Sequence, residues 1–169
     1  MALLQWIQET LRCEFLDHAF TFITHLGDVG IVWILLGVVL LCRKTTRRWG
    51  WAVLFSLLFA YVIGDLIIKN IVQRPRPFTK AEIELLIPPP DSWSFPSGHS
   101  GSSFAAATAL FLCSKKWGAP ALVLAGLIAL SRMYLFVHYP SDVLCGILLG
   151  VLTACAVHWW MTRKKVKTE

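Results

Sequence analysis

Charged residues are scarce in this sequence. Only 15% of its 169 residues are Asp, Glu, Lys or Arg, whereas 56% are hydrophobic. A soluble domain of this length carries about a quarter charged residues, and the apolar residues here lie in long blocks rather than in alternation. The composition therefore excludes an ordinary soluble domain and predicts an integral membrane protein.

The sequence also lacks the cysteine patterns of metal sites and disulfide frameworks. Its five cysteines are scattered, with neither a CxxC pair nor a Cys/His ligand spacing. The net charge of +6 comes from short basic clusters between apolar blocks. No basic stripe is interleaved with aromatic residues, as nucleic-acid recognition requires. We therefore expect neither a metal site nor a nucleic-acid partner.

The apolar blocks predict an all-α fold, a polytopic membrane helix bundle that forms one domain over residues 1–169. A membrane span needs roughly 20 apolar residues, and five blocks reach or approach that length. Residues 1–18 are too polar to span but repeat apolar residues at helical spacing, which predicts an interfacial amphipathic helix. The bundle covers residues 21–161, with spans expected at 21–42, 50–72, 99–114, 118–137 and 142–161, and a basic tail follows at 162–169.

Basic residues predict the orientation of this bundle. The loops after the first and third spans and the C-terminal tail hold ten of the 16 Lys and Arg residues, and five spans place all three segments on one side. The positive-inside rule makes that side cytoplasmic. The loop 73–98 and the turn near His138 then face the periplasm or exterior of a plasma or inner membrane. The ten residues are Arg43, Lys44, Arg47, Arg48, Lys115, Lys116, Arg163, Lys164, Lys165 and Lys167.

Four further basic residues break this bias near the outer ends of the second and fourth spans. Charges at membrane depth are costly and usually functional, so we expect an anionic ligand there. Three stretches meet at that face: KNIVQRPRPF (69–78), SFPSGHS (94–100) and SRMYLFVHYPSD (131–142). The four basic residues are Lys69, Arg74, Arg76 and Arg132.

The residue types in these stretches fit a phosphate site. Lys69, Arg76 and Arg132 supply three positive charges, and a guanidinium presents a planar fork that suits phosphate oxygens. Ser97 and Gly98 begin the third span, where the backbone N–H groups and the helix dipole favour an anion.

Two histidines, His99 and His138, flank this pocket. One can attack phosphorus while the other protonates the leaving oxygen. Asp142 follows His138 by four residues, about one helical turn, and can hold one ring nitrogen so that the other stays free. The spacing alone leaves open which histidine attacks.

Each pattern also has a purely structural interpretation. The Ser-Gly pair can cap a helix, and the Arg-Pro-Arg-Pro run can form a rigid turn. Asp65 precedes Lys69 by four residues and can neutralise it across one turn. A purely structural ion pair with Lys69 and a role in adjusting the charge of the site are equally open for Asp65. We interpret His25 and Asp28 as a polar rim. The coincidence of three patterns at one membrane face is what favours a site.

The three patterns resemble the signature of the type-2 phosphatidic acid phosphatase superfamily, membrane lipid phosphate phosphatases related to vanadium haloperoxidases. They read Lys-x6-Arg-Pro, Pro-Ser-Gly-His and Ser-Arg-x5-His-x3-Asp, and every signature position is filled between residues 50 and 160. The resemblance implies that His138 forms a phosphohistidine, that Asp142 orients it and that His99 is the general acid. It implies no metal and no cofactor. The implied phosphate-binding residues are Lys69, Arg76, Ser97, Gly98 and Arg132.

The resemblance further implies a metal-independent phosphatase whose substrate is a lipid phosphate or diphosphate of the bilayer. Among small bacterial members we favour similarity to undecaprenyl-diphosphate phosphatases over phosphatidylglycerophosphate phosphatases. A lipid A phosphatase, a phosphotransferase and a catalytically silent lipid-binding scaffold remain alternatives, because no residue separates these lipids. The first of the family's usual six spans is missing here. A partner protomer in a homo-oligomer, or the N-terminal helix, would then wall the lipid entrance.

Overall fold

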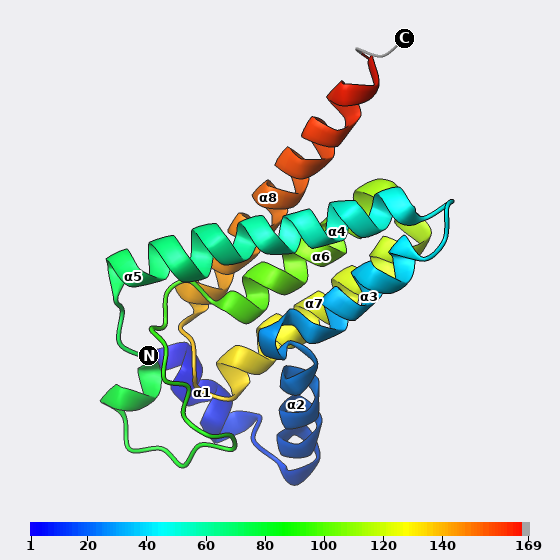
Figure 1. Cartoon of the computed structure of the whole chain (residues 1–169). Helices are drawn as coiled ribbons and strands as arrows, with labels where there is room; N and C mark the ends of the chain where they lie inside the picture. The colour runs from blue at the N-terminus through cyan, green and yellow to red at the C-terminus, as the bar shows by residue number, and fades with distance from the viewer. Residues whose placement is uncertain (167–169) are drawn as a thin grey trace.

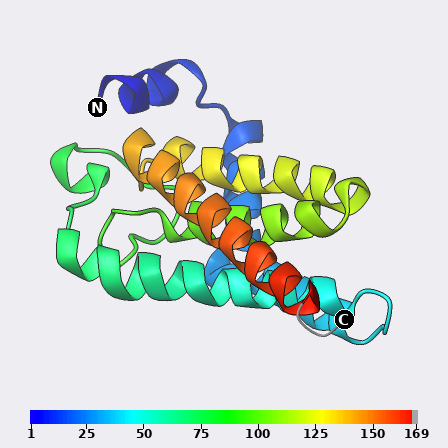
Figure 2. The same cartoon turned by 90° about the horizontal axis from the view of Figure 1, so that it is seen from above.

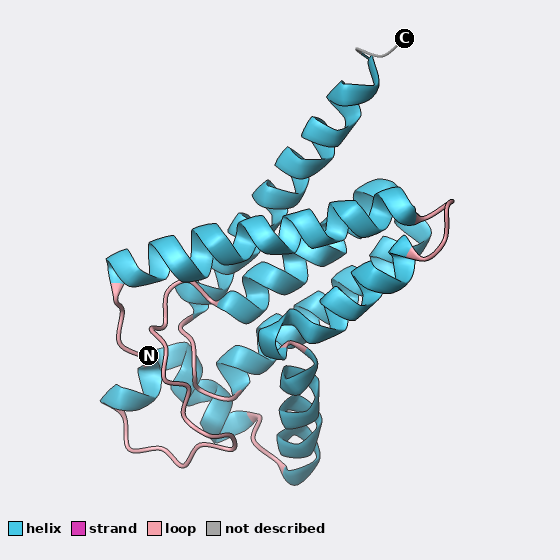
Figure 3. Cartoon of the chain, viewed as in Figure 1, coloured by secondary structure: helices cyan, strands magenta, loops and turns pink. Residues whose placement is uncertain are grey.

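The computed structural model describes residues 1–166, and in this part of the chain every regular element is a helix (Figures 1 and 3). The predicted all-α class is confirmed. Lys167 of the predicted basic tail lies outside the described residues. The elements are α1 (Ala2–Thr10), α2 (Glu14–Leu26), η1 (Asp28–Gly30), α3 (Ile31–Leu41), α4 (Arg47–Tyr61), the π-helix η2 (Val62–Ile68), α5 (Lys69–Val72), η3 (Pro77–Lys80), α6 (Gly98–Cys113), α7 (Lys115–Tyr134) and α8 (Pro140–Val166).

Several of these helices can cross a membrane. Three stretches, Arg47–Lys80, Lys115–Tyr134 and Pro140–Arg163, are long and apolar enough, and α2 and α3 pass the same test together as a pair bent by 42°. The 16 residues of α6 span roughly 24 Å at about 1.5 Å per residue, less than the ~30 Å hydrocarbon core. The described helices thus support three crossings, or four with the bent pair, and the fifth stays a prediction.

The first expected span, 21–42, is not one continuous helix. α2 ends at Leu26, and Val29 and Gly30 have φ angles of 54° and 68°. An α-helix cannot contain this left-handed conformation, which glycine adopts without a steric penalty. α3 therefore starts again at Ile31 in a new direction, as Figure 1 shows for α2 and α3.

The predicted helix over residues 1–18 is also divided. α1 ends at Thr10, and α2 begins after Cys13, whose backbone is extended. Glu14 and Asp17 lie in the first turn of α2, where negative charge is favourable. The hydroxyl of Tyr134 accepts a hydrogen bond of 3.4 Å from the N–H of Cys13, so tertiary contacts with α7 stabilise this second helix start.

α1 packs beneath the segment that carries His138. Leu4 is buried against Phe136 and Tyr139, and Ile7 is buried against the neighbouring residues 134–137. Because α1 covers this segment, it holds the turn between α7 and α8 in place.

α6 is the central helix and packs against α4, α7 and α8. Its sequence, GHSGSSFAAATALFLC, is rich in small residues, which let neighbouring backbones approach closely. A Cβ atom on Gly150 of α8 would lie only 2.4 Å from the carbonyl oxygen of Gly101. Figure 2 shows α8 crossing the pair formed by α6 and α7. This close crossing fixes the starts of α6 and α8 relative to each other.

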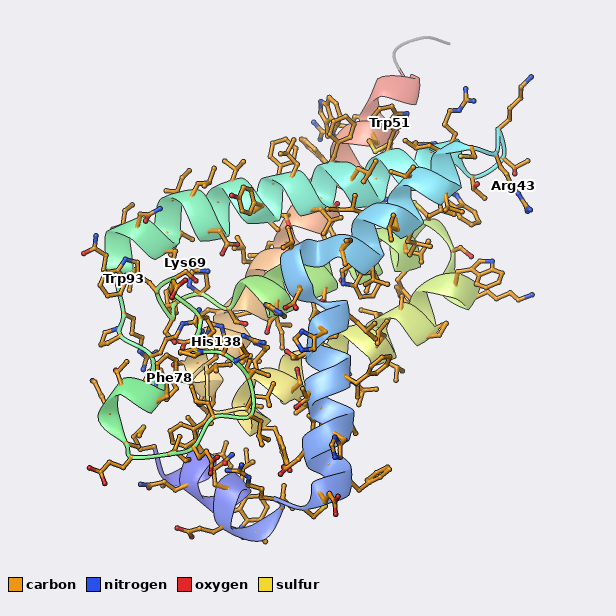
Figure 4. The ribbon with its side chains drawn as sticks, turned by 60° about the horizontal axis from the view of Figure 1, so that its bottom comes forward. Arg43, Trp51, Lys69, Phe78, Trp93 and His138 are labelled. Atoms are coloured by element: carbon orange, nitrogen blue, oxygen red, sulfur yellow. The ribbon has the colours of Figure 1, made fainter. Side chains whose placement is uncertain are left out.

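The predicted basic loops and the predicted site lie at opposite ends of the bundle. The α3–α4 loop and the α6–α7 junction lie at one end, and the loop 73–97 and the turn before α8 lie at the other (Figure 1). Figure 4 shows the same separation between Arg43 at one end and Lys69 and His138 at the other.

Candidate active site

One cavity of about 480 Å³ brings together seven of the eight predicted site residues. They come from α5, the loop after it, the start of α6, the end of α7 and the turn before α8. Asp142 is the exception and is fully buried beside His138. The seven residues are Lys69, Arg76, Ser97, Gly98, His99, Arg132 and His138, of which Figure 4 labels Lys69 and His138.

The surroundings of His138 fix its tautomer. Its Nε2 atom lies 3.2 Å from Nη1 of Arg76. A guanidinium can only donate hydrogen bonds, so Nε2 is the acceptor and the ring hydrogen is on Nδ1. His138 therefore presents an unprotonated nitrogen beside a cation that lines the cavity.

The imidazole of His138 is also kept neutral. His138 lies in the turn between α7 and α8 and is 2% exposed. Burial, together with the positive charges of Arg76 and Arg132, holds the pKa of His138 well below its ordinary value, although Asp142 acts in the opposite direction. The ring is therefore neutral at pH 7, as a nucleophile must be.

Asp142 contacts His138 less directly than the spacing suggests. Its Oδ2 atom lies 3.6 Å from Nδ1 of His138, which is too long for a hydrogen bond. The buried hydroxyl of Ser94 donates to Oδ2 at 2.6 Å and lies 3.4 Å from Nδ1. Because the single hydroxyl hydrogen goes to the carboxylate, the oxygen of Ser94 can accept from Nδ1. Ser94 thus bridges the two side chains.

Arg74 neutralises the same carboxylate from the other side. Its Nη1 atom donates to Oδ1 of Asp142 at 2.6 Å and to the hydroxyl of Ser141 at 2.8 Å. The guanidinium lies 3.9 Å from the centroid of the Tyr139 ring, a cation–π contact. The N–H of Tyr139 donates to Oδ2 at 2.9 Å. Asp142 is therefore a fully paired buried carboxylate.

Arg76 is tied to the loop that encloses the cavity. Its Nε donates to the carbonyl of Ser92 at 2.7 Å, and its Nη1 donates to the carbonyl of Val137 at 2.9 Å. Its Nη2 contacts the hydroxyl of Ser92 and the carbonyl of Trp93. Arg76 therefore supplies a charge in a fixed direction, and it shapes the loop at the same time.

Lys69 and Asp65 form a partly buried pair in this cavity. Nζ of Lys69 donates to Oδ1 of Asp65, which lies one turn earlier in the π-helix η2. A Cβ atom on Gly98 would lie 2.8 Å from that same Oδ1, so glycine lets the carboxylate approach the start of α6. The expected pairing exists, and the carboxylate also lines the cavity.

The SFPSGHS stretch both caps a helix and lines the cavity. Ser97 is the N-cap of α6, and its hydroxyl accepts a hydrogen bond from the N–H of Ser100. The N–H of Ser97 donates to the carbonyl of Asp142 at 3.0 Å. The starts of α6 and α8 are therefore joined directly at the site.

Arg132 approaches the cavity from α7. It is 3% exposed, and its Nη1 donates to the hydroxyl of Thr24 in α2. Its Nε has no hydrogen-bond partner among the described residues. An anion in the cavity is the kind of ligand that this charge would attract.

His99 has an acidic partner that we had interpreted as part of a polar rim. Its Nε2 lies 2.9 Å from Oδ1 of Asp28, and Nδ1 of His25 lies 2.7 Å from Oδ2 of the same carboxylate. Asp28 is about half exposed, as a polar rim residue would be, and it also contacts a cavity-lining histidine.

The sequence patterns assigned no role to Ser94 and did not identify Asp28 as a partner of His99. They placed Arg74 among the basic residues at this face but did not predict its contact with Asp142. Ser94 lies within a stretch that carries a pattern, so its proximity was a usable signal. Asp28 had no such signal, because only the break between α2 and α3 brings it to His99.

The sequence matches a known family. The family model of the PAP2 superfamily matches residues 49–165, which include all three patterns. The chain therefore belongs to the PAP2 superfamily, and the predicted resemblance is confirmed.

A curated relative supports the same family. The undecaprenyl-diphosphatase of Sulfolobus acidocaldarius is 38% identical over 121 residues, which cover 70% of this chain and 58% of that protein. The match therefore spans less than two thirds of the relative.

Solved structures share the architecture. LpxE of Aquifex aeolicus has a TM-score of 0.81 at 30% identity, with 92% of each chain covered. A PAP2-type phosphatidylglycerolphosphate phosphatase of Bacillus subtilis has a TM-score of 0.79 at 27% identity, with 96% of this chain and 84% of that chain covered. The fold is thus that of PAP2 membrane phosphatases.

Proposed function

We propose that the chain is a lipid phosphatase that hydrolyses a polyprenyl diphosphate, with undecaprenyl diphosphate favoured, through a phosphohistidine. The observation that supports this most is the cavity itself, which combines two histidines and three cations with an apolar wall. Such a cavity accommodates a phosphate and an aliphatic chain at once.

The proposed chemistry assigns a role to each histidine. Nε2 of His138 forms a bond to the terminal phosphorus while the bond from phosphorus to the leaving oxygen breaks, and His99 gives a proton to that oxygen. Water then attacks the phosphohistidine, His99 takes a proton from it, and phosphate leaves. Lys69, Arg76 and Arg132 stabilise the charge on the equatorial oxygens.

The apolar wall indicates where the lipid chain lies. Ile34 of α3 and Leu54, Leu58 and Tyr61 of α4 line the same cavity as the charged residues. Ile34, Leu58 and Tyr61 are also exposed on the bundle surface. We propose that the chain of the lipid leaves the site sideways between α3 and α4. The residues that line this cavity come from outside α1, which favours α3 and α4 over the N-terminal helix as walls of the proposed entrance.

The favoured substrate follows from similarity and shape. The Sulfolobus relative is named for undecaprenyl diphosphate, and the proposed exit between α3 and α4 would suit a single isoprenoid chain. A phosphatidylglycerophosphate remains the second candidate, because the Bacillus structure carries that name. A lipid A phosphatase and a phosphotransferase are further alternatives, and a silent scaffold is a remote one.

The proposed orientation places the site on the outer face and the C-terminus in the cytoplasm. Arg43, Lys44, Lys115 and Lys116 lie at the end of the bundle opposite the cavity, in agreement with the positive-inside rule. We propose α6 as the fifth crossing. It packs against α4, α7 and α8, and a helix that these neighbours shield from lipid can be shorter than the hydrocarbon core. Labelling of single cysteines from outside, at exposed positions of the loop 78–95, tests this orientation.

A substrate panel tests the function. Detergent-purified protein is given undecaprenyl diphosphate, phosphatidylglycerophosphate and lipid A side by side, and phosphate release is measured as kcat/KM. We expect the highest value with undecaprenyl diphosphate. A higher value with another lipid would move the assignment to that lipid, and transfer of phosphate to an added lipid acceptor would indicate a phosphotransferase. No release from any lipid would favour the scaffold.

A further inference from the structure

We propose that Asp28 is the positioning residue of His99, so that each histidine of the site has its own carboxylate. The inference rests on the proposed function, since it assigns a role within that reaction. Asp28 lies outside the residues that the family model matches, and therefore outside the three patterns.

The contacts of Asp28 define how His99 is held. A carboxylate only accepts hydrogen bonds, so the 2.9 Å contact with Oδ1 places a hydrogen on Nε2 of His99. Nδ1 is then the ring nitrogen from which a proton can be given up. His25 contacts the second oxygen of Asp28 at 2.7 Å and fixes the rotation of the carboxylate.

The helix break creates this contact. The left-handed conformations of Val29 and Gly30 end the helical path directly after Asp28, so the carboxylate reaches toward α6. Gly27 lets the ring of His99 lie against the backbone, because a Cβ atom there would be 2.8 Å from Cδ2 of His99. Cδ2 is bonded to Nε2, so Gly27 and Asp28 hold the same edge of the ring.

The chemistry of the site needs such a partner. Arg76 and Arg132 line the same cavity as His99, and their positive charges oppose formation of an imidazolium. The carboxylate of Asp28, 2.9 Å from Nε2, acts in the opposite direction. In the first step the proton on Nδ1 moves to the leaving oxygen as its bond to phosphorus breaks. Nε2 keeps its hydrogen throughout and donates it in a hydrogen bond to Asp28. In the second step Nδ1 takes a proton from water.

The two carboxylates differ in what else they contact. Asp142 is fully buried, and its charge is paired with that of Arg74. Because of this pairing, Asp142 does not hold His138 in its charged form. Asp28 is half-exposed, and its carboxylate contacts two imidazoles, those of His25 and His99. Separate environments can thus keep one histidine as nucleophile and the other as acid.

Leaving-group dependence tests this role. Octyl phosphate releases an alkoxide that must be protonated, whereas p-nitrophenyl phosphate releases a stable nitrophenolate. The quantity compared is kcat/KM, which reports formation of the phosphohistidine and not its later hydrolysis, in which His99 acts with either substrate. For Asp28→Asn we expect kcat/KM to fall about 10- to 100-fold with octyl phosphate, and by less than about threefold with p-nitrophenyl phosphate. His99→Ala should show the same selectivity, and the double variant should be no slower than His99→Ala. Glu14→Gln, which removes an exposed carboxylate in α2, is the matched control.

The remaining variants separate a positioning role from a structural one. Asp28→Glu should recover part of the lost rate. Gly27→Ala leaves the carboxylate unchanged but brings a Cβ atom within 2.8 Å of both His99 Cδ2 and Ile128 Cγ2. Combined with Ile128→Leu, which removes the Cγ2 methyl at the second contact, it should give the same selective loss and provides a second test if Asp28→Asn is unstable. An equal loss with both substrates, or no loss with either, would overturn the inference.

The same assay separates the inference from the proposed function. A wild-type protein that hydrolyses octyl phosphate but not undecaprenyl diphosphate would refute the favoured lipid, and the selective effect of Asp28→Asn would still support the role of Asp28. A wild-type protein that hydrolyses neither octyl phosphate nor undecaprenyl diphosphate would overturn both the proposed function and the role of Asp28.

Discussion

The imidazole of His138 and the carboxylate of Asp142 stand 3.6 Å apart, and the hydroxyl of Ser94 fills the space between them. The proposed nucleophile is thus oriented through a third side chain. A buried hydroxyl that bridges two partners is part of the geometry on which the reaction depends.

Ser94→Ala should therefore impair chemistry more than binding. Without the bridge, Nδ1 of His138 has no acceptor within hydrogen-bond distance, and the ring can turn. We expect kcat to fall about 10- to 100-fold with KM nearly unchanged, measured with octyl phosphate. Ser141→Ala, which removes a hydroxyl that accepts from Arg74 and does not contact His138 among the described residues, is the control. A kcat for Ser94→Ala equal to that of the wild type would contradict the bridging role.

Arg74→Gln should lower stability. It removes the cation that neutralises the buried carboxylate of Asp142, and an unpaired buried charge is costly. Because Arg74 is about one third exposed, we expect a loss of about 1–3 kcal/mol in the free energy of unfolding. Thermal unfolding in detergent measures this loss, with Arg43→Gln in an exposed loop as the control. Equal melting temperatures for Arg74→Gln and the wild type would show that the pair is not stabilising.

Asp65→Asn distinguishes pairing from tuning. The carboxylate of Asp65 lies in the cavity and competes with phosphate for the charge of Lys69. Its removal should strengthen product inhibition by inorganic phosphate about fivefold. If Asp65 only holds Lys69 in place, the inhibition constant for phosphate would instead rise, because the lysine would lose its position.

The low pKa of His138 predicts a flat response to acid. Its neutral form is the nucleophile, and that form persists below the ordinary pKa of 6.5 because burial disfavours the charged ring. With p-nitrophenyl phosphate, whose leaving group needs no proton from His99, kcat/KM for nitrophenol release reports the attack by His138 and should change less than about twofold between pH 7.5 and 5.5. An imidazole with an ordinary pKa would lose about tenfold over this range, and such a loss would contradict the prediction.

Sequence reasoning succeeded where a pattern is local. Three short patterns, each set by helix ends, identified seven residues that now line one cavity. The helical class followed from apolar blocks, and the end of the second span at residue 72 matches the end of α5. These features depend on nearby residues, so the sequence carries them directly.

The features that the sequence did not predict have a common physical cause. The first expected span is broken because Val29 and Gly30 adopt positive φ angles, and an apolar run gives no sign of such a change. Asp28 reaches His99 only through this break. The division of residues 1–18 depends likewise on contacts with Tyr134, which is remote in sequence.

Phosphate release by wild type and His138→Ala, each in EDTA, tests the central claim most directly. The account predicts that wild-type protein releases phosphate from undecaprenyl diphosphate in the presence of the chelator, and that His138→Ala loses at least about 10³-fold in kcat. Release that persists in His138→Ala would show that this histidine is not the nucleophile. Wild-type release that is abolished by EDTA and restored by a divalent metal would show that the reaction is not metal-independent.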